Sequence, residues 1–164
     1  MSYTYRGPIQ RPTPSARAAK ATFARISLAK REELLSRVPM FAELKKGQVR
    51  SIARITETVR YPAGEEMVTE GSIGDFCAII VEGSAEVTKG SASIAKLGSG
   101  ELFGELALVD PGPRSATVRA LNELTAIKID QDAFAKVVTE DPRIALRVLQ
   151  VLARRVRETT ERLG

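Results

Sequence analysis

Two short stretches of this chain carry residue types that could bind a charged small molecule: residues 103–108 (F-G-E-L-A-L) and residues 114–118 (R-S-A-T-V). Gly104 has no Cβ, so the backbone there can come unusually close to a ligand. The first stretch is typical of a strand end that breaks into a short helical turn, and amides at a helix start lack partners within the helix. The amides of Leu106 and Ala107 are therefore predicted to be free donors, an arrangement that binds anions.

Arg114 and Glu105 indicate what the ligand would be. Arg114 presents a planar guanidinium fork, the group best suited to bidentate contact with a phosphate. Glu105 would repel a phosphate, so its carboxylate must face a neutral donor, and a ribose hydroxyl is such a donor. The pair predicts a ligand with one compact phosphate and a sugar hydroxyl beside it. Two other interpretations stay open: a salt bridge from Arg114 to Asp110, and a helix-capping role for Glu105.

These stretches resemble the phosphate-binding cassette of cyclic nucleotide-binding domains, a family of β-barrel sensors of cyclic nucleotide monophosphates. The resemblance runs from about Leu35 to the C-terminus. It implies that Glu105 accepts a hydrogen bond from the ribose 2′-OH, that Arg114 binds the cyclic phosphate, and that the Ser115 hydroxyl and backbone amides complete the cage. The site that the resemblance implies consists of Phe103, Gly104, Glu105, Leu106, Ala107, Arg114, Ser115 and Ala116, with the amides of Leu106, Ala107 and Ala116 as backbone donors.

The C-terminal stretch predicts a long helix that starts at Asp141-Pro142 and runs to Leu163. Apolar residues recur at alternating intervals of four and three, the pattern of a heptad seam, and a second apolar face can pack on the barrel. We expect a parallel homodimer through this helix, and the alternative is one wide stripe on one core. The predicted seam is Ala145, Leu149, Leu152, Val156, Thr159 and Leu163, and the second face is Ile144, Val148 and Val151.

Residues 153–164 resemble the dimer helix of the catabolite activator branch of the same family. In that branch a Thr-Ser pair contacts the adenine amino group, one residue from each subunit, which implies the same role for Thr159 and Thr160. There the helix leads into a helix-turn-helix DNA-binding domain, whereas this sequence stops at Gly164. We therefore expect a stand-alone sensor with no DNA-binding domain, which relays ligand binding to an unidentified effector protein.

The middle of the chain, residues 57–129, alternates short β-branched runs with breaks that contain glycine. Many short strands at turn-sized spacing predict a barrel or jelly roll. A helical turn at residues 104–109 interrupts this pattern, and a helical insertion in a β-roll exposes amide donors that strands would otherwise pair. The strands are predicted at 57–61, 66–69, 76–82, 85–89, 93–97, 115–120 and 124–129.

Helical periodicity flanks this region, at about 23–37 and 46–56 before it and, after a cap at Asp130, at about 131–139. The predicted fold class is α+β, mainly β: a cyclic nucleotide-binding β-roll or jelly-roll barrel flanked by N-terminal helices and a long C-terminal helix. The predicted domain covers 23–164, with helices over 23–56 and 130–163.

Composition argues against catalysis and metal binding. The chain has no histidine and one cysteine, which removes histidine-based acid–base chemistry and nearly excludes a zinc site. Cys77 stands in an apolar run and is predicted to be a buried, inert thiol. No apolar run is long enough to cross a bilayer, and the N-terminus has no secretory apolar segment. We expect a cytoplasmic protein that is not an enzyme.

The net charge of +5 is concentrated at the ends of the chain. Residues 1–31 carry seven basic and no acidic side chains, whereas residues 32–142 carry twelve basic and eighteen acidic ones. Residues 1–22 contain three prolines and show no period, so they are predicted to be a disordered basic tail. The tail is interpreted as solvated; the alternative is a docking arm for an acidic partner, anionic lipid or nucleic acid.

Cyclic AMP is favoured over cyclic GMP as the ligand. Guanine-selective members of the family often carry Thr directly after the cassette arginine, whereas this chain has Ser115, and the Thr159-Thr160 pair suits an exocyclic amine. Cyclic GMP stays open as the ligand. A ligand-free interaction or oligomerisation module of the same fold is the competing class of function, and an enzyme is disfavoured because no nucleophile–base pair is visible.

Overall fold

The computed structural model describes residues 25–163, so the predicted tail 1–22 lies outside the described residues. The helices are α1 (Leu28–Ser36), α2 (Lys46–Ile55), α3 (Gln131–Glu140) and α4 (Pro142–Leu163), with 3₁₀ helices η1 (Pro39–Phe41) and η2 (Glu105–Leu108). The strands are β1 (Glu57–Tyr61), β2 (Glu66–Val68), β3 (Ile73–Gly74), β4 (Phe76–Glu82), β5 (Ala85–Lys89), β6 (Ala92–Leu97), β7 (Leu102–Phe103), β8 (Gly112–Pro113), β9 (Thr117–Ala120) and β10 (Leu124–Asp130). The predicted class, a β-roll with flanking helices, is confirmed.

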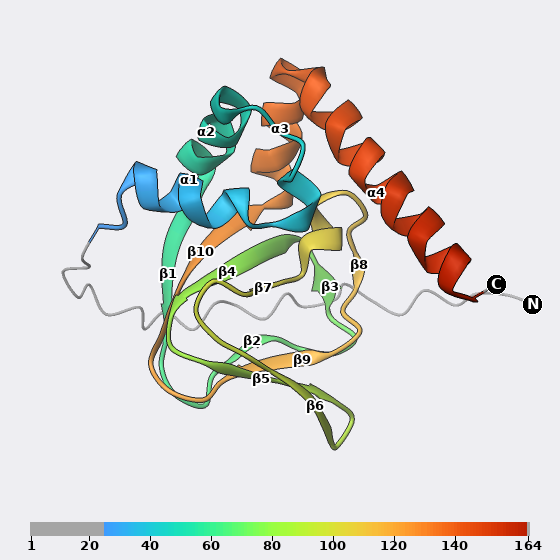
Figure 1. The fold of residues 1–164 in the computed structure, drawn as a ribbon. Helices are drawn as coiled ribbons and strands as arrows, with labels where there is room; N and C mark the ends of the chain where they lie inside the picture. Colours follow the sequence, from blue (N-terminus) through green and yellow to red (C-terminus); the bar gives the residue numbers. More distant parts are fainter. Residues whose placement is uncertain (1–24, 164) are drawn as a thin grey trace, which may run out of the picture.

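Two four-stranded antiparallel sheets form the roll, one in the order β1-β10-β4-β7 and the other in the order β2-β9-β5-β6 (Figure 1). Strands β3 and β8 form a small two-stranded ribbon beside them. One buried cluster draws side chains from both four-stranded sheets, which shows that the sheets pack face to face. Its members are Met67, Val68, Ala78, Ile80, Ala85, Phe103, Val118, Ala120, Leu124 and Ala126.

Strand β4 is buried on both faces. Successive side chains of a strand point to opposite sides, and here Ala78 and Ile80 belong to the roll interior whereas Cys77 and Ile79 belong to a second cluster under the helices. All four side chains are fully buried. This double burial explains why residues 77–81 are continuously apolar instead of alternating with polar residues.

The helices lie over the outer face of the β1-β10-β4 sheet (Figure 1). The cluster beneath them includes residues from α1, η1, α2 and α3, and α4 contributes Ile144 and Val148. Val151 of α4 is also buried, as the predicted second face requires. Beyond Leu152 every described α4 residue is exposed, so only the first half of this helix packs on the domain.

The starts of helices α1 and α3 differ from the sequence prediction. Helix α1 begins at Leu28 instead of residue 23, because the Ser27 hydroxyl accepts a hydrogen bond from Lys30 N at 3.2 Å and caps the helix there. Asp130 occupies the N-cap of α3 but makes no side-chain cap bond; its carboxylate pairs with Lys128 Nζ at 3.1 Å.

The exposed apolar stripe of α4 overlaps the predicted seam. Leu149, Val156 and Leu163 of that seam are exposed and Leu146 is exposed beside them, whereas Leu152 packs partly against the core under the helices. The predicted seam thus reaches the edge of the buried face, and sequence spacing alone does not show how far the buried face extends around the helix.

Candidate functional site

A cavity of about 620 Å³ opens between the roll and η2. All eight cassette residues predicted from the sequence line it, and apolar residues from the roll complete its wall. The lining is Val68, Val87, Leu97, Leu102, Phe103, Gly104, Glu105, Leu106, Ala107, Asp110, Gly112, Pro113, Arg114, Ser115, Ala116 and Val118. Its charged and hydroxyl side chains are those of Glu105, Asp110, Arg114 and Ser115, and the rest of the lining is apolar or glycine.

Gly104 creates the turn that separates β7 from η2. It has φ 78°, a left-handed conformation that favours glycine, and it is the N-cap of η2. A Cβ at this position would also overlap Nη1 of Arg114 and lie 2.9 Å from the Phe76 carbonyl oxygen. Glycine is therefore required here both by backbone conformation and by space.

The amide of Ala107 is not free, contrary to the sequence prediction. It donates to the Gly104 carbonyl oxygen at 3.1 Å, because a 3₁₀ turn closes one residue earlier than an α-turn. The Ser115 hydroxyl, in contrast, makes no hydrogen bond within residues 25–163. Ser115 is exposed at the cavity wall, so its hydroxyl is available to a ligand.

Arg114 is half-buried and makes no ion pair with a carboxylate of the described residues, although the charge of Asp75 lies near it. Its Nη2 donates to the Phe76 carbonyl oxygen at 2.7 Å, and no ion pair joins it to Asp110 or to any other carboxylate within residues 25–163. Burial lowers the pKa of the guanidinium, and the nearby charge of Asp75 opposes that shift. A cation without a carboxylate partner in a cavity wall attracts an anion.

Glu105 faces α4 with one carboxylate oxygen and is unpartnered at the other. Its Oε1 accepts from Arg155 Nη1 at 2.9 Å, while its Oε2 is buried and has no hydrogen-bond partner. The carboxylate makes no cap bond to η2, so the capping interpretation is not observed. A buried acceptor without a donor is costly, so Oε2 is able to accept a hydrogen bond from a group that enters the cavity.

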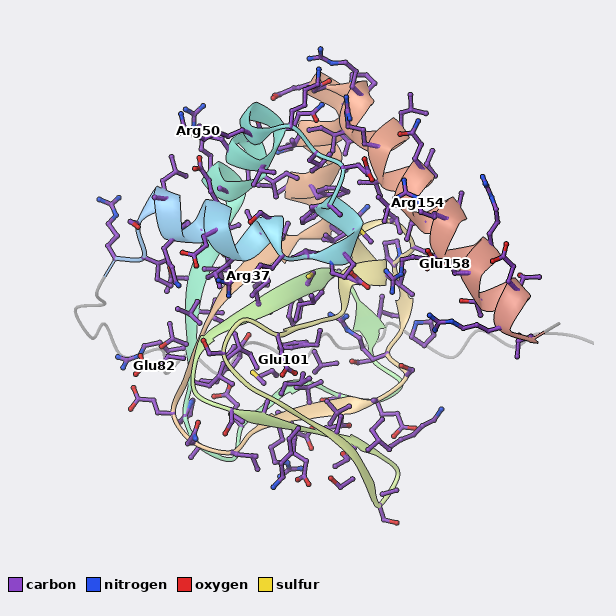
Figure 2. All side chains as sticks on the ribbon, in the orientation of Figure 1. Arg37, Arg50, Glu82, Glu101, Arg154 and Glu158 are labelled. Carbon is purple, nitrogen blue, oxygen red and sulfur yellow. The ribbon has the colours of Figure 1, made fainter. Side chains whose placement is uncertain are left out.

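Thr159 and Thr160 lie away from the cavity. Both are exposed on the projecting half of α4, and their hydroxyls donate to the carbonyl oxygens of Arg155 and Val156 at 2.9 and 3.0 Å. Figure 2 shows the neighbouring Glu158 on the same outer part of the helix. The structure thus brings together the eight cassette residues and leaves the threonine pair apart.

Three residues at the site were missed by the sequence analysis: Arg155, Phe76 and Gly74. Arg155 belongs to a run of arginines that gives no sign of which one turns inward. Phe76 holds Arg114 through a carbonyl oxygen, which any residue could supply. Gly74 makes room for Arg114, since a Cβ there would lie 2.5 Å from Nε; its position in a turn was the one available signal.

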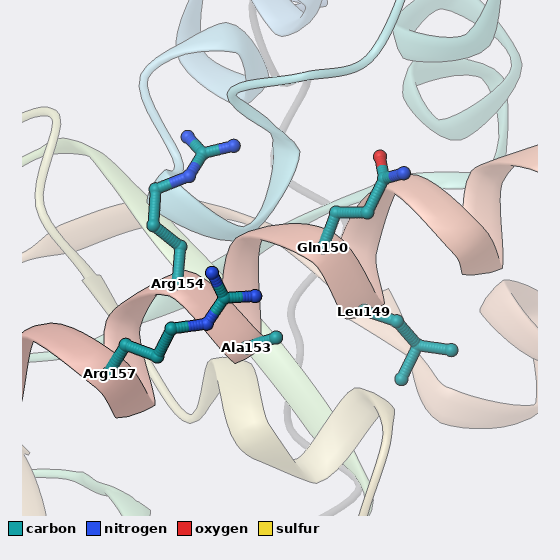
Figure 3. A pocket seen from close by; sticks show the side chains of 5 residues that line it. All are labelled: Leu149, Gln150, Ala153, Arg154 and Arg157. Atoms are coloured by element: carbon teal, nitrogen blue, oxygen red, sulfur yellow. The ribbon is translucent and has the colours of Figure 1, made fainter.

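A second hollow, of about 550 Å³, lies on α4 and is lined by Leu149, Gln150, Ala153, Arg154 and Arg157 (Figure 3). All of its lining comes from a single helix, so it is a surface groove on the exposed side of α4. Arg154 is anchored by Glu43 Oε1 at 2.9 Å. This groove contains none of the cassette residues.

Other chemistry finds little support in the described part of the chain. The Cys77 thiol is buried and its pKa is raised by burial to about 12, which confirms the prediction of an inert thiol. Among residues 25–163, no cluster of acidic or cysteine side chains is placed to hold a metal ion. None of the helices described combines the length and apolar character that a membrane span requires.

Sequence comparison shows which known proteins this chain resembles. The family model described as cyclic nucleotide-binding domain matches residues 58–141. A CRP-like cAMP-activated global transcriptional regulator of Mycobacterium tuberculosis is 29% identical over 138 residues, covering 81% of this chain and 62% of the regulator. A cAMP-dependent protein kinase regulatory subunit of Schizosaccharomyces pombe is 38% identical over 108 residues, covering 65% of this chain and 26% of the subunit. The chain thus spans less than two thirds of the length of these relatives.

Solved structures show the same fold. The N-terminal domain of a transcriptional regulator from Streptomyces coelicolor A3(2) superposes with a TM-score of 0.74 at 32% identity, covering 78% of this chain and 95% of that domain. The catabolite activator protein of Thermus thermophilus gives a TM-score of 0.62 at 27% identity, covering 76% of this chain and 61% of that protein.

Proposed function

This chain belongs to the cyclic nucleotide-binding domain family, and from that premise we propose that it is a non-catalytic sensor of a cyclic nucleotide monophosphate. The observation that carries the proposal is that one cavity contains a cation that makes no ion pair and an acceptor without a hydrogen-bond donor. Arg114 is a half-buried cation that makes no ion pair within residues 25–163, and Glu105 Oε2 is a buried acceptor without a donor. A cyclic phosphate fused to a ribose supplies an anion and a hydroxyl in one rigid ligand.

The roles of the cassette residues follow from their chemistry. Arg114 binds the cyclic phosphate with the guanidinium donors that the Phe76 carbonyl leaves free, and the Ser115 hydroxyl adds a further bond. Glu105 Oε2 accepts from the ribose 2′-OH. The amides of Leu106 and Ala116 complete the phosphate contacts.

Phe103 and Gly104 shape the floor of the phosphate end, and the apolar wall receives the base. Val87 and Leu97 come from the β5-β6 hairpin and offer the base apolar contact without hydrogen bonds. Base selection therefore depends on groups outside that wall.

Cyclic AMP is the proposed ligand, with cyclic GMP as the alternative. Support comes from the serine at position 115 and from relatives described as cAMP-activated or cAMP-dependent. Thr159 and Thr160 are the proposed contacts of the adenine amino group. Since they lie outside the cavity, this contact requires α4 to move toward the roll or a second copy to supply its own helix.

Helix α4 is the proposed relay from the cavity to a partner. The Arg155–Glu105 pair joins the ribose end of the cavity to the projecting half of α4, and the exposed Arg154–Glu43 pair is the other contact of this half with the domain. Ligand can shift the position of α4 only by binding one arrangement more tightly than the other. We expect amide hydrogen exchange to slow at residues 103–117 and at 155–163 when cyclic AMP is added, and slowing confined to 103–117 would refute the relay.

A parallel homodimer through α4 is the proposed assembly, and an effector protein is the proposed recipient of the signal. The support is the exposed apolar stripe of Leu146, Leu149 and Val156, which are 57%, 61% and 65% exposed. Large exposed apolar side chains at heptad spacing indicate a helix–helix contact. A ligand-free oligomerisation module remains the competing function, and it predicts the dimer without the nucleotide.

Titration calorimetry with cyclic AMP and cyclic GMP tests the proposal. Arg114→Ala is expected to weaken binding about 30-fold or more, because truncating one member of a desolvated charge pair costs about 2–5 kcal/mol. Arg119→Ala is the matched control, since Arg119 lies on the adjacent strand β9, is exposed and pairs with Glu66. Equal affinity of Arg114→Ala and the wild type would refute the cassette, and heat from neither nucleotide would favour the ligand-free module.

A further inference from the structure

The Arg114 guanidinium lies in a cradle that the cassette only partly supplies. We use the name arginine cradle for Gly74, Phe76 and Gly104. Cβ atoms on the two glycines would meet the guanidinium, at 2.5 Å from Nε in the case of Gly74, and Phe76 accepts from Nη2 at 2.7 Å. The backbone at Gly74 and Gly104 therefore packs closely against the side chain, and the Phe76 carbonyl oxygen fixes one nitrogen of its fork.

The Phe76 ring adds a second contact to the same guanidinium. Arg114 Cζ lies 4.8 Å from the ring centroid, within the range of a cation–π interaction. Lys128 Nζ lies 4.8 Å from the same centroid. The strand register explains why Lys128 lies near the Phe76 ring. Phe76 of β4 pairs with Asp130 of β10, and Lys128 is two residues before Asp130 on the same strand. The Asp130 carboxylate also pairs with Lys128 Nζ at 3.1 Å.

The nature of these contacts suits an arginine that must bind a phosphate. A carboxylate partner would neutralise the guanidinium and compete with the ligand anion, whereas a carbonyl dipole and a ring quadrupole orient a cation without cancelling its charge. No carboxylate of the described residues lies within ion-pair distance of Arg114, and the charge of Asp75 acts on it without forming an ion pair. Binding to a side chain that is already oriented avoids the entropy cost of ordering it.

We propose that Phe76 is a positioning residue, whose ring and carbonyl oxygen fix Arg114 in the orientation that receives the cyclic phosphate. Lys128 lies over the same ring and is itself paired with Asp130. The inference rests on the proposed function, because the phosphate is its intended occupant. The cassette sequence contains no sign of it, since Phe76 is 38 residues from Arg114.

The experiment compares Phe76→Leu with Phe76→Tyr. Both keep the carbonyl oxygen and an apolar side chain, but only tyrosine keeps the ring. The first readout is the Nε–H resonance of Arg114 in protein labelled with ¹⁵N, identified by its loss in Arg114→Lys. A ring beneath the guanidinium shifts this proton upfield, so we expect the shift in the wild type and Phe76→Tyr and its loss in Phe76→Leu.

The second readout is the affinity for cyclic AMP by calorimetry. Phe76→Leu should bind about 3- to 10-fold more weakly, the range of a partly desolvated cation–π contact, and Phe76→Tyr within about twofold of wild type. Val59→Ala is the control for stability, because Val59 packs on the same cluster but does not line the cavity. An unchanged Arg114 resonance in Phe76→Leu, or an unchanged affinity, overturns the proposal.

Two further outcomes are decided by the same measurements. If Phe76→Leu does not fold, Lys128→Met leaves the ring to Arg114 alone, and an Arg114 proton without an upfield shift in that variant overturns the proposal. If the wild type binds neither nucleotide, the proposed function fails, and the resonance still shows whether the ring holds the guanidinium.

Discussion

Replacing Glu105 by alanine and removing the 2′-hydroxyl of the ligand should each cost the same free energy, and together they should cost it only once. Glu105 Oε2 is buried without a partner, and the whole side chain is 17% exposed. An unpaired buried acceptor costs about 1–3 kcal/mol, and a ribose hydroxyl removes that cost. We therefore expect 2′-deoxy cyclic AMP to bind the wild type roughly 5- to 150-fold more weakly than cyclic AMP.

Four calorimetric titrations complete the cycle: wild type and Glu105→Ala, each with cyclic AMP and 2′-deoxy cyclic AMP. The expected coupling is about 1–3 kcal/mol, because each change alone breaks the same bond. Glu101→Ala is the matched control, since Glu101 is an exposed carboxylate near β7 that does not line the cavity. Losses that simply add would show that Glu105 does not touch the 2′-OH.

The same variant should not lose stability, because Glu105→Ala removes the buried, unpartnered Oε2 together with its ion pair. That ion pair is with Arg155, whose side chain is 46% exposed, and pairs at that exposure contribute about 0–1 kcal/mol. Thermal denaturation checks that the weaker binding is measured on a folded protein.

Three further predictions concern space, assembly and pH. Gly74→Ala should weaken cyclic AMP binding about tenfold, because its Cβ would displace Arg114. The control is Gly47→Ala, whose Cβ would have no atom within 4 Å; it should leave binding unchanged and stabilise α2 by about 0.5–1 kcal/mol. Equal affinities in the two variants would contradict the cradle. Leu149→Arg should give monomers by light scattering without loss of stability, since Leu149 is 61% exposed, and a wild type that is already monomeric would refute the dimer. Burial raises the pKa of Cys77 from 9.0 to about 12, so the folded state keeps a proton that the unfolded state releases. This contribution to the free energy of unfolding is complete below pH 9 and is lost toward pH 12, with a slope of at most about 1.4 kcal/mol per pH unit. Denaturant titrations at several pH values measure it, and Cys77→Ala should abolish this part of the slope.

The sequence by itself determined the elements whose signals are local. The predicted strands at 57–61, 76–82 and 85–89 match β1, β4 and β5, because runs of β-branched residues bounded by glycine and proline set strand limits over a few residues. The turn at η2 was visible for the same reason, since Gly104 and the following apolar residues act within one turn of chain. The eight cassette residues that line the cavity are likewise close in sequence.

Tertiary structure alone decided the contacts that join distant segments. Strands β3, β7 and β8 have two residues each, too few for a pattern, and they exist because partners elsewhere in the chain pair with them. The packing of the helix on the sheets decides which arginine of α4 reaches Glu105. It also decides that a carbonyl oxygen and an aromatic ring of Phe76 contact Arg114. The extent of the exposed α4 stripe was decided in the same way, because helical periodicity shows that a face is apolar but not which surface covers it.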